Sequence, residues 1–83
     1  HSMTARLEPF AELRQDRPVL LVAERLKNCA TVLELARVAR AKGFEVLTAP
    51  GGFAQDIRIE DGSTTRNYTV RGAKLFIDRL DGV

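Results

Sequence analysis

The spacing of hydrophobic residues predicts one helix in the middle of the chain. A helix face repeats at i, i+3, i+4 and i+7, and four residues follow that spacing: Val32, Leu35, Ala36 and Ala39. Thr31 and Glu34 have the spacing of a capping box, in which each side chain satisfies a backbone N–H of the other residue. Gly43 suits a left-handed helix end. We therefore expect a helix from Thr31 to just before Gly43.

After Gly43 the sequence changes to short segments typical of strands, and the clearest alternates between inward Ile57 and Ile59 and outward polar residues. Three such segments follow one another: Glu45–Ala49, Phe53–Glu60 and Thr65–Arg71. The turn residues Pro50-Gly51-Gly52 separate the first two, and Asp61-Gly62-Ser63 separates the last two. Short turns between consecutive strands predict a three-stranded antiparallel meander.

The chain closes with a second helical pattern, from about Ala73 to Asp81. Its apolar face is expected to pack with the first helix against the inward side chains of the sheet. The helix residues expected in this core are Val32, Leu35, Ala36, Ala39, Phe76, Ile77 and Leu80, and the strand residues are Val46, Ile57, Ile59, Tyr68 and Val70.

The segment Pro18–Asn28 fits two structures. Val19, Val22, Ala23 and Leu26 match the helical spacing, and Pro18 suits a first helical turn, so we favour a helix. The continuous apolar run from Val19 to Ala23 also fits a buried strand, and this alternative stays open. A further short helix is expected over residues 7–15, which begins near Pro9.

Together these elements predict the α+β class, with a three-stranded antiparallel sheet flanked by helices. The expected core is α-β-β-β-α over residues 31–82, and residues 4–28 form a helical N-terminal extension. Residues 4–83 then make a single small domain, and residues 1–3 look like an expression scar followed by the native start.

Composition narrows the function only a little. Of the 83 residues, 13 are basic and 11 are acidic, so the net charge of +2 neither demands nor excludes nucleic acid. The chain shows no apolar run long enough to span a membrane, so no membrane association is expected. A single cysteine, Cys29, permits no internal disulfide, which fits a cytoplasmic protein.

The residues needed for catalysis are largely missing. The one histidine is His1, within the expected scar, so hydroxyl nucleophiles such as Ser63 lack a base to activate them. Cys29 is more typical of a small packed residue than of a nucleophile. Gly51-Gly52 joins strand to strand, whereas phosphate-binding loops join a strand to a helix. We expect no enzyme, no metal site and no cofactor.

Basic side chains form one candidate binding surface. We expect four of them to share a face that binds RNA or DNA: Arg58, Arg66, Arg71 and Lys74. Asp56, Glu60 and Asp61 lie among them and would repel a polyanion. The leading hypothesis is thus a small non-enzymatic binding module, with nucleic acid as one partner class.

The alternative hypothesis is a protein-interaction or regulatory module, such as an adaptor, an inhibitor or a homodimer. It would use apolar residues of the N-terminal segment, which are Leu7, Phe10, Leu20 and Leu21.

From Thr31 onward the chain resembles the HicA family of toxin–antitoxin ribonucleases. The shared features are a helix that closes on Gly43-Phe44, a strand that reaches Gly51-Gly52, a strand that ends at Asp61-Gly62, a third strand and a final helix. The resemblance implies a fold like that of double-stranded-RNA-binding domains and a nucleic-acid-binding surface. The family has a histidine after the glycine turn, where this chain has Phe53-Ala54, so ribonuclease activity is not implied.

A smaller part of the chain is similar to the opening β-α-β unit of response-regulator receivers. The similarity comprises Pro18–Val22, the helix after it and the run Gly43–Ala49. The paired acidic residues that follow the first strand in receivers are absent.

Overall fold

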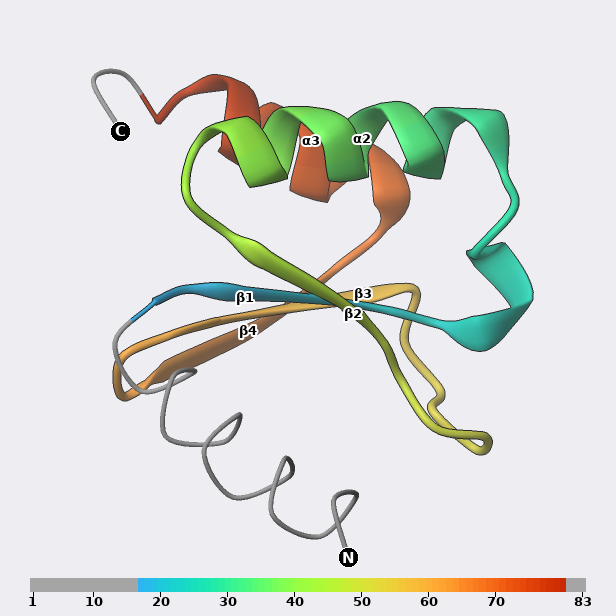
Figure 1. Cartoon of the computed structure of the whole chain (residues 1–83). Helices are drawn as coiled ribbons and strands as arrows, with labels where there is room; N and C mark the ends of the chain where they lie inside the picture. Colours follow the sequence, from blue (N-terminus) through green and yellow to red (C-terminus); the bar gives the residue numbers. More distant parts are fainter. Residues whose placement is uncertain (1–16, 81–83) are drawn as a thin grey trace, which may run out of the picture.

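A computed structural model describes residues 17–80 of the chain. Two helices and a four-stranded sheet account for most of this range (Figure 1). In chain order the elements are strand β1 (Val19–Val22), the short 3-10 helix η1 (Glu24–Leu26), helix α2 (Ala30–Ala41), strands β2 (Glu45–Thr48), β3 (Ile57–Asp61) and β4 (Thr64–Tyr68), and helix α3 (Val70–Asp78).

The sheet is mixed, and its strand order is β2-β1-β3-β4. Strand β1 pairs in parallel with β2 and antiparallel with β3, and β3 pairs antiparallel with β4. The α+β class is confirmed, but the expected three-stranded meander is wrong, because β1 lies between β2 and β3. The turn through Gly51 and Gly52 therefore does not close a hairpin between neighbours. It carries the chain past β1 to the other side of that strand.

The segment Val19–Val22 is a strand, so the favoured helical interpretation is wrong and its alternative is confirmed. Val19 and Leu20 are neighbours that point to opposite faces of the sheet, and they are 1% and 0% exposed. Burial on both sides of the strand accounts for the continuous apolar run. Within the described range, residues 17–28 hold this strand and η1 in place of a helical extension. The helix expected over residues 7–15 lies outside the described residues.

Both helices lie side by side on one face of the sheet (Figure 1). The connection β1-α2-β2 is a β-α-β unit, which is the usual way to join parallel strands. The core between the layers is formed by buried residues from every layer: Leu20, Val22, Val32, Leu35, Ala39, Phe44, Ile57, Ile59, Ala73 and Ile77. Most of the expected core residues are buried here or packed against it, including Phe76, Leu80, Val46 and Tyr68.

Several element boundaries differ from those expected, among them the end of β4, which is Tyr68 and not Arg71. Strand β3 begins at Ile57 and not at Phe53, and α3 begins at Val70 and not near Ala73. Thr69 explains the earlier start of α3, because its hydroxyl accepts a hydrogen bond from the Gly72 N–H at 3.1 Å and so caps the helix. Val70, expected inside the third strand, is the first residue of α3 and packs at the edge of the core.

Candidate functional site

The register of the sheet separates the two basic strand residues. Arg58 lies opposite Asn67 and Arg66 lies opposite Ile59 in the β3–β4 pair. Residues that face each other across a ladder share a face, and successive residues alternate. Arg66 therefore lies on the same face as the core residue Ile59, on the edge strand, and Arg58 lies on the opposite face. The strands do not bring these two arginines together.

Arg58 is held by its neighbours on the open face of the sheet. Its guanidinium carbon lies 4.9 Å from the ring centre of Phe53, which is a cation–π contact. Its Nε donates to Oδ1 of Asn67 at 3.2 Å. These contacts engage the guanidinium of Arg58, a half-buried residue, with neighbours on the sheet.

Arg71 and Lys74 lie on exposed positions of α3. Lys74 Nζ is 2.9 Å from Oδ2 of Asp78, one helical turn further on. This ion pair offsets part of the positive charge that a nucleic-acid surface would need. The four predicted basic residues are thus distributed over α3 and both faces of the sheet.

The apolar residues that were predicted to contact a protein partner also do not form one surface within the described residues. Leu20 is fully buried in the core, so its side chain is not available at the surface. Leu21 is half-buried on the face of the sheet that the helices leave open. Leu7 and Phe10 lie outside the described residues.

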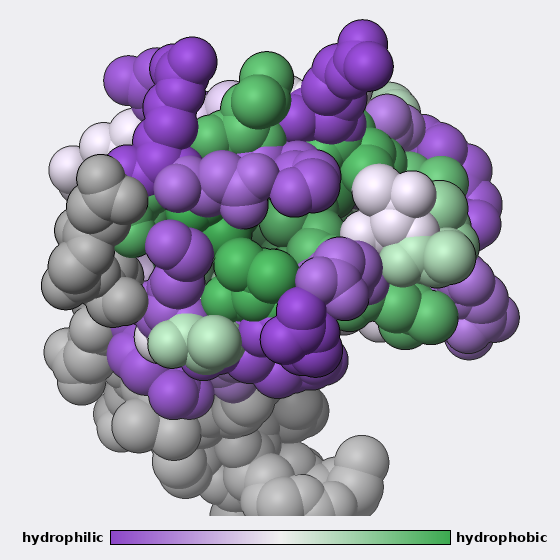
Figure 2. Space-filling model, turned by 90° about the horizontal axis from the view of Figure 1, so that it is seen from above, coloured by the Kyte–Doolittle hydropathy of each residue, from purple (hydrophilic) through white to green (hydrophobic). Residues whose placement is uncertain are grey.

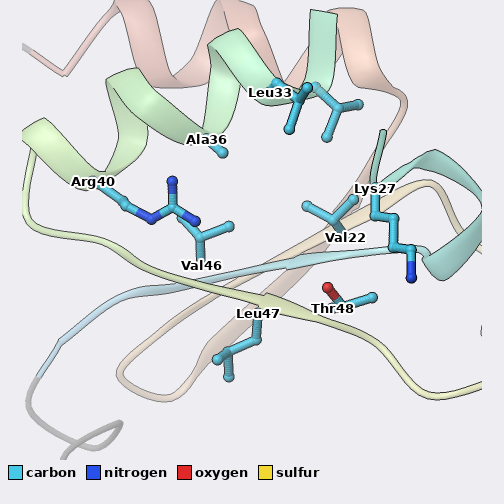
Figure 3. A pocket seen from close by; sticks show the side chains of 9 residues that line it. Val22, Lys27, Leu33, Ala36, Arg40, Val46, Leu47 and Thr48 are labelled. Carbon is cyan, nitrogen blue, oxygen red and sulfur yellow. The ribbon is translucent and has the colours of Figure 1, made fainter. Parts of the chain in front are cut away.

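A different apolar feature lies between α2 and the edge strand β2. There the surface forms a groove of about 100 Å³ (Figure 3). The residues that line it come from β1, α2, β2 and the turn before α2: Val22, Lys27, Val32, Leu33, Ala36, Arg40, Val46, Leu47 and Thr48.

Leu33 is the exposed apolar side chain of this groove. It is 55% exposed, although α2 already buries its main apolar face against the sheet. Seen from above, green hydrophobic residues show between the hydrophilic ones over the helix layer (Figure 2). An exposed leucine beside a hollow with apolar walls is the kind of feature that interaction surfaces contain. Its sequence signal was weak, because Leu33 falls outside the core spacing of α2.

Two cationic side chains lie at opposite ends of the groove, with the apolar residues between them (Figure 3). Lys27 is at the end near Thr48, and its Nζ forms an exposed ion pair of 2.7 Å with Glu24. Arg40 is at the end near Val46, and it forms no ion pair with any residue from 17 to 80. Arg40 and Arg17 also line a second hollow of about 430 Å³ beside the start of β2, and Glu45 lines it with them.

The acidic groups near the groove are paired or turned away from it. Arg37 donates from Nε and Nη2 to the two carboxylate oxygens of Glu34. These hydrogen bonds and the charge of the guanidinium lower the pKa of Glu34. Glu45 lies opposite Val19 in the ladder, so its side chain leaves β2 on the face away from the helices. The groove is therefore apolar in the middle, with Arg40, which has no ion pair among residues 17–80, at one end and Lys27, paired with Glu24, at the other.

Residues 17–80 contain no group of three or more histidine, cysteine, aspartate or glutamate side chains placed to hold a metal ion. Cys29 is exposed directly before α2, so the expectation that it is a packed residue is wrong.

Between residues 17 and 80, neither helix has the length and apolar character needed to cross a bilayer. Comparisons with protein-family models, with curated proteins and with solved structures find no match for this chain.

Proposed function

We propose that this domain is a non-enzymatic binding module that holds a protein partner in the groove between α2 and β2. The observation that carries the proposal is Leu33, a half-exposed leucine above an apolar hollow with a cation at each end. Full burial of an exposed leucine contributes about 1.5–3 kcal/mol, and because Leu33 is 55% exposed, its burial on binding would contribute roughly half of that. The flanking charges add orientation more than affinity.

This proposal moves the expected protein-interaction surface from the N-terminal segment to the groove. The reason is that Leu20 is buried in the core and Leu33 is exposed at an edge of the fold. Nucleic-acid binding stays a prediction, which the HicA resemblance motivates. It receives less support, because Arg58 and Arg66 lie on opposite faces of the sheet.

Site-specific photo-crosslinking tests the proposal. A photo-reactive benzoylphenylalanine replaces Leu33 in the full chain, and in a matched variant it replaces Leu75. Leu75 is the right control because it is 52% exposed on α3, close to the 55% of Leu33. We expect cells that produce the protein to yield a defined protein adduct from position 33 only. The adduct should disappear when Arg40→Glu is added.

Fluorescence anisotropy with labelled RNA and DNA, at low and at physiological salt, tests whether the partner is a nucleic acid instead of a protein. Saturable binding that weakens with salt and is lost in both Arg58→Glu and Arg66→Glu would favour nucleic acid as the partner. Identical adducts from positions 33 and 75 would count against the groove.

A further inference from the structure

Within residues 17–80, one edge of strand β2 has no neighbouring strand. Among the described residues β2 pairs with β1 alone, so one of its sides is open. The N–H of Glu45 donates to the Pro18 carbonyl at 2.9 Å, and the N–H of Ala49 donates to the Val22 carbonyl at 2.7 Å. Because backbone groups alternate in direction along a strand, those of Val46 and Thr48 point away from β1.

These outward groups have no hydrogen-bond partner among residues 17–80. An edge of this kind presents a template for an incoming strand, which would form main-chain hydrogen bonds with it. The N–H and C=O of Val46 and of Thr48 supply two donors and two acceptors.

The groove lies on the face where an added strand would need apolar contacts. Val46 lies opposite Leu20 and Thr48 lies opposite Val22, so both side chains face the helix layer. A strand beside β2 would direct every second side chain to that same face. Those side chains would meet the exposed Leu33 above the groove.

The charges at the ends of the groove determine the chemistry of the occupant. Arg40 has no ion pair within the described range, and Lys27 is paired only with an exposed glutamate. Exposed pairs of this type contribute about 0–1 kcal/mol, so Lys27 can exchange Glu24 for another carboxylate at little cost. A segment with carboxylates complements both ends of the groove, and a basic segment is repelled.

The opposite edge of the sheet lacks these features. Strand β4 is also an edge strand, but Thr64, Thr65, Arg66 and Asn67 are all exposed and polar. A hollow of about 310 Å³ lies beside the end of β4, but polar residues make up most of its lining, which is Gln55, Asp56, Asn67, Tyr68 and Thr69. The β4 edge therefore provides matched control positions.

We propose that an extended segment of a partner protein, with alternating apolar and acidic residues, adds to β2 as a fifth strand. This inference rests on the proposed function and specifies its partner class. Main-chain hydrogen bonds to Val46 and Thr48 supply affinity. Apolar side chains at Leu33 and carboxylates at Arg40 and Lys27 supply specificity.

Amide hydrogen exchange of the full chain, followed by NMR, tests strand addition directly. The probe is a nine-residue capped peptide of alternating valine and glutamate, and its control has lysine in place of glutamate. In the free chain the amides of Val46 and Thr48 should exchange faster than those of Glu45 and Leu47. With the acidic peptide at about ten times its Kd, exchange at Val46 and Thr48 should slow roughly tenfold, because it then proceeds from the free fraction.

Substitutions in the groove test whether the peptide that slows amide exchange at Val46 and Thr48 binds there. Leu33→Asp and Arg40→Glu should each weaken binding of the acidic peptide by about tenfold or more, since each loses an apolar or a charge-assisted contact. Two control variants should leave the Kd of the acidic peptide unchanged. Leu75→Asp matches Leu33→Asp in exposure, and Arg66→Glu matches Arg40→Glu in charge. Thr48→Pro removes an outward donor while the bonds to β1 remain, so it should also weaken binding. Circular dichroism confirms that each variant is folded.

Three results would overturn the inference. Slow exchange of the Val46 and Thr48 amides in the free chain would mean that the β2 edge is already covered. If this protection rises with protein concentration, a second copy covers the edge; if it does not, another part of the same chain does. Equal or absent binding of the two peptides would refute the acidic partner. Binding that depends on Leu33 but leaves both amides unprotected would refute strand addition, while the photo-crosslinks from position 33 could still support the groove.

Discussion

At the residue scale, the backbone at Gly43 shows how one position ends an element. Gly43 has φ of +95°, in the left-handed region that residues with a side chain rarely adopt. It follows α2, and its N–H bonds to the Arg40 carbonyl at 3.0 Å. The reversal lets Phe44 turn into the core and β2 begin directly afterwards.

Gly43→Ala is therefore expected to lower the free energy of unfolding by about 1–2 kcal/mol. A Cβ at this position would meet no atom within 4 Å, so the cost is conformational and not steric. Urea denaturation measures the change. Gly51→Ala is the control, because its site is equally open and its φ is not positive, and it should change stability by less than about 0.5 kcal/mol. Equal losses in both variants would contradict this explanation.

At the element scale, the two helices begin in different ways. The start of α2 is at Ala30, and the residue before it, Cys29, makes no side-chain capping bond. The capping box expected from Thr31 and Glu34 does not form: Thr31 is already inside the helix, and Glu34 is bonded to Arg37. In α3, by contrast, the hydroxyl of Thr69 caps the helix.

The caps lead to opposite expectations for two threonines. Thr69→Ala should cost about 1 kcal/mol of stability, because the Gly72 N–H loses its acceptor. Thr31→Ala should be neutral or stabilising by a few tenths of a kcal/mol, because alanine is the better helix former inside α2. Thermal and urea denaturation of both variants measure the difference. A larger loss from Thr31→Ala would show that it acts as the cap in solution.

At the scale of the whole molecule, β1 holds the two halves of the sheet together. It pairs with β2 on one side and β3 on the other, and it contributes Leu20 to the core under the helices. Without this strand, β2 would have no partner among the described elements. The β2 edge and the groove beside it depend on the same arrangement.

Leu20→Ala is expected to lower the free energy of unfolding by about 2–5 kcal/mol, as other buried leucine truncations do. Leu20 is 0% exposed, so its removal leaves a cavity between the layers. Since small domains have total stabilities near 5–15 kcal/mol, this is a large fraction. Leu21→Ala, one residue away on the open face and half-buried, should cost clearly less. Urea denaturation that finds equal losses would contradict the placement of β1.

Residue spacing and turn residues predicted the elements that depend only on residues close together in the sequence. The helix over Ala30–Ala41 follows from the spacing of Val32, Leu35, Ala36 and Ala39. The hairpin at Asp61-Gly62 follows from its turn residues and from the alternation before it. The order of the strands was not predictable in this way, because a run such as Val19–Val22 fits both a helix face and a buried strand. Whether Val19–Val22 is buried on two faces depends on the elements packed around it and not on the residues of the segment.

The sequence by itself determined the α+β class, the central helix, the glycine that ends it and most of the residues in the core. Tertiary structure alone decided that β1 is inserted between β2 and β3, that Arg58 and Arg66 face opposite ways, and that Leu33, Arg40 and Lys27 surround one groove. The reason is physical. Periodicity and turn chemistry act over a few neighbouring residues, whereas strand order and a surface groove depend on contacts between segments far apart in the chain.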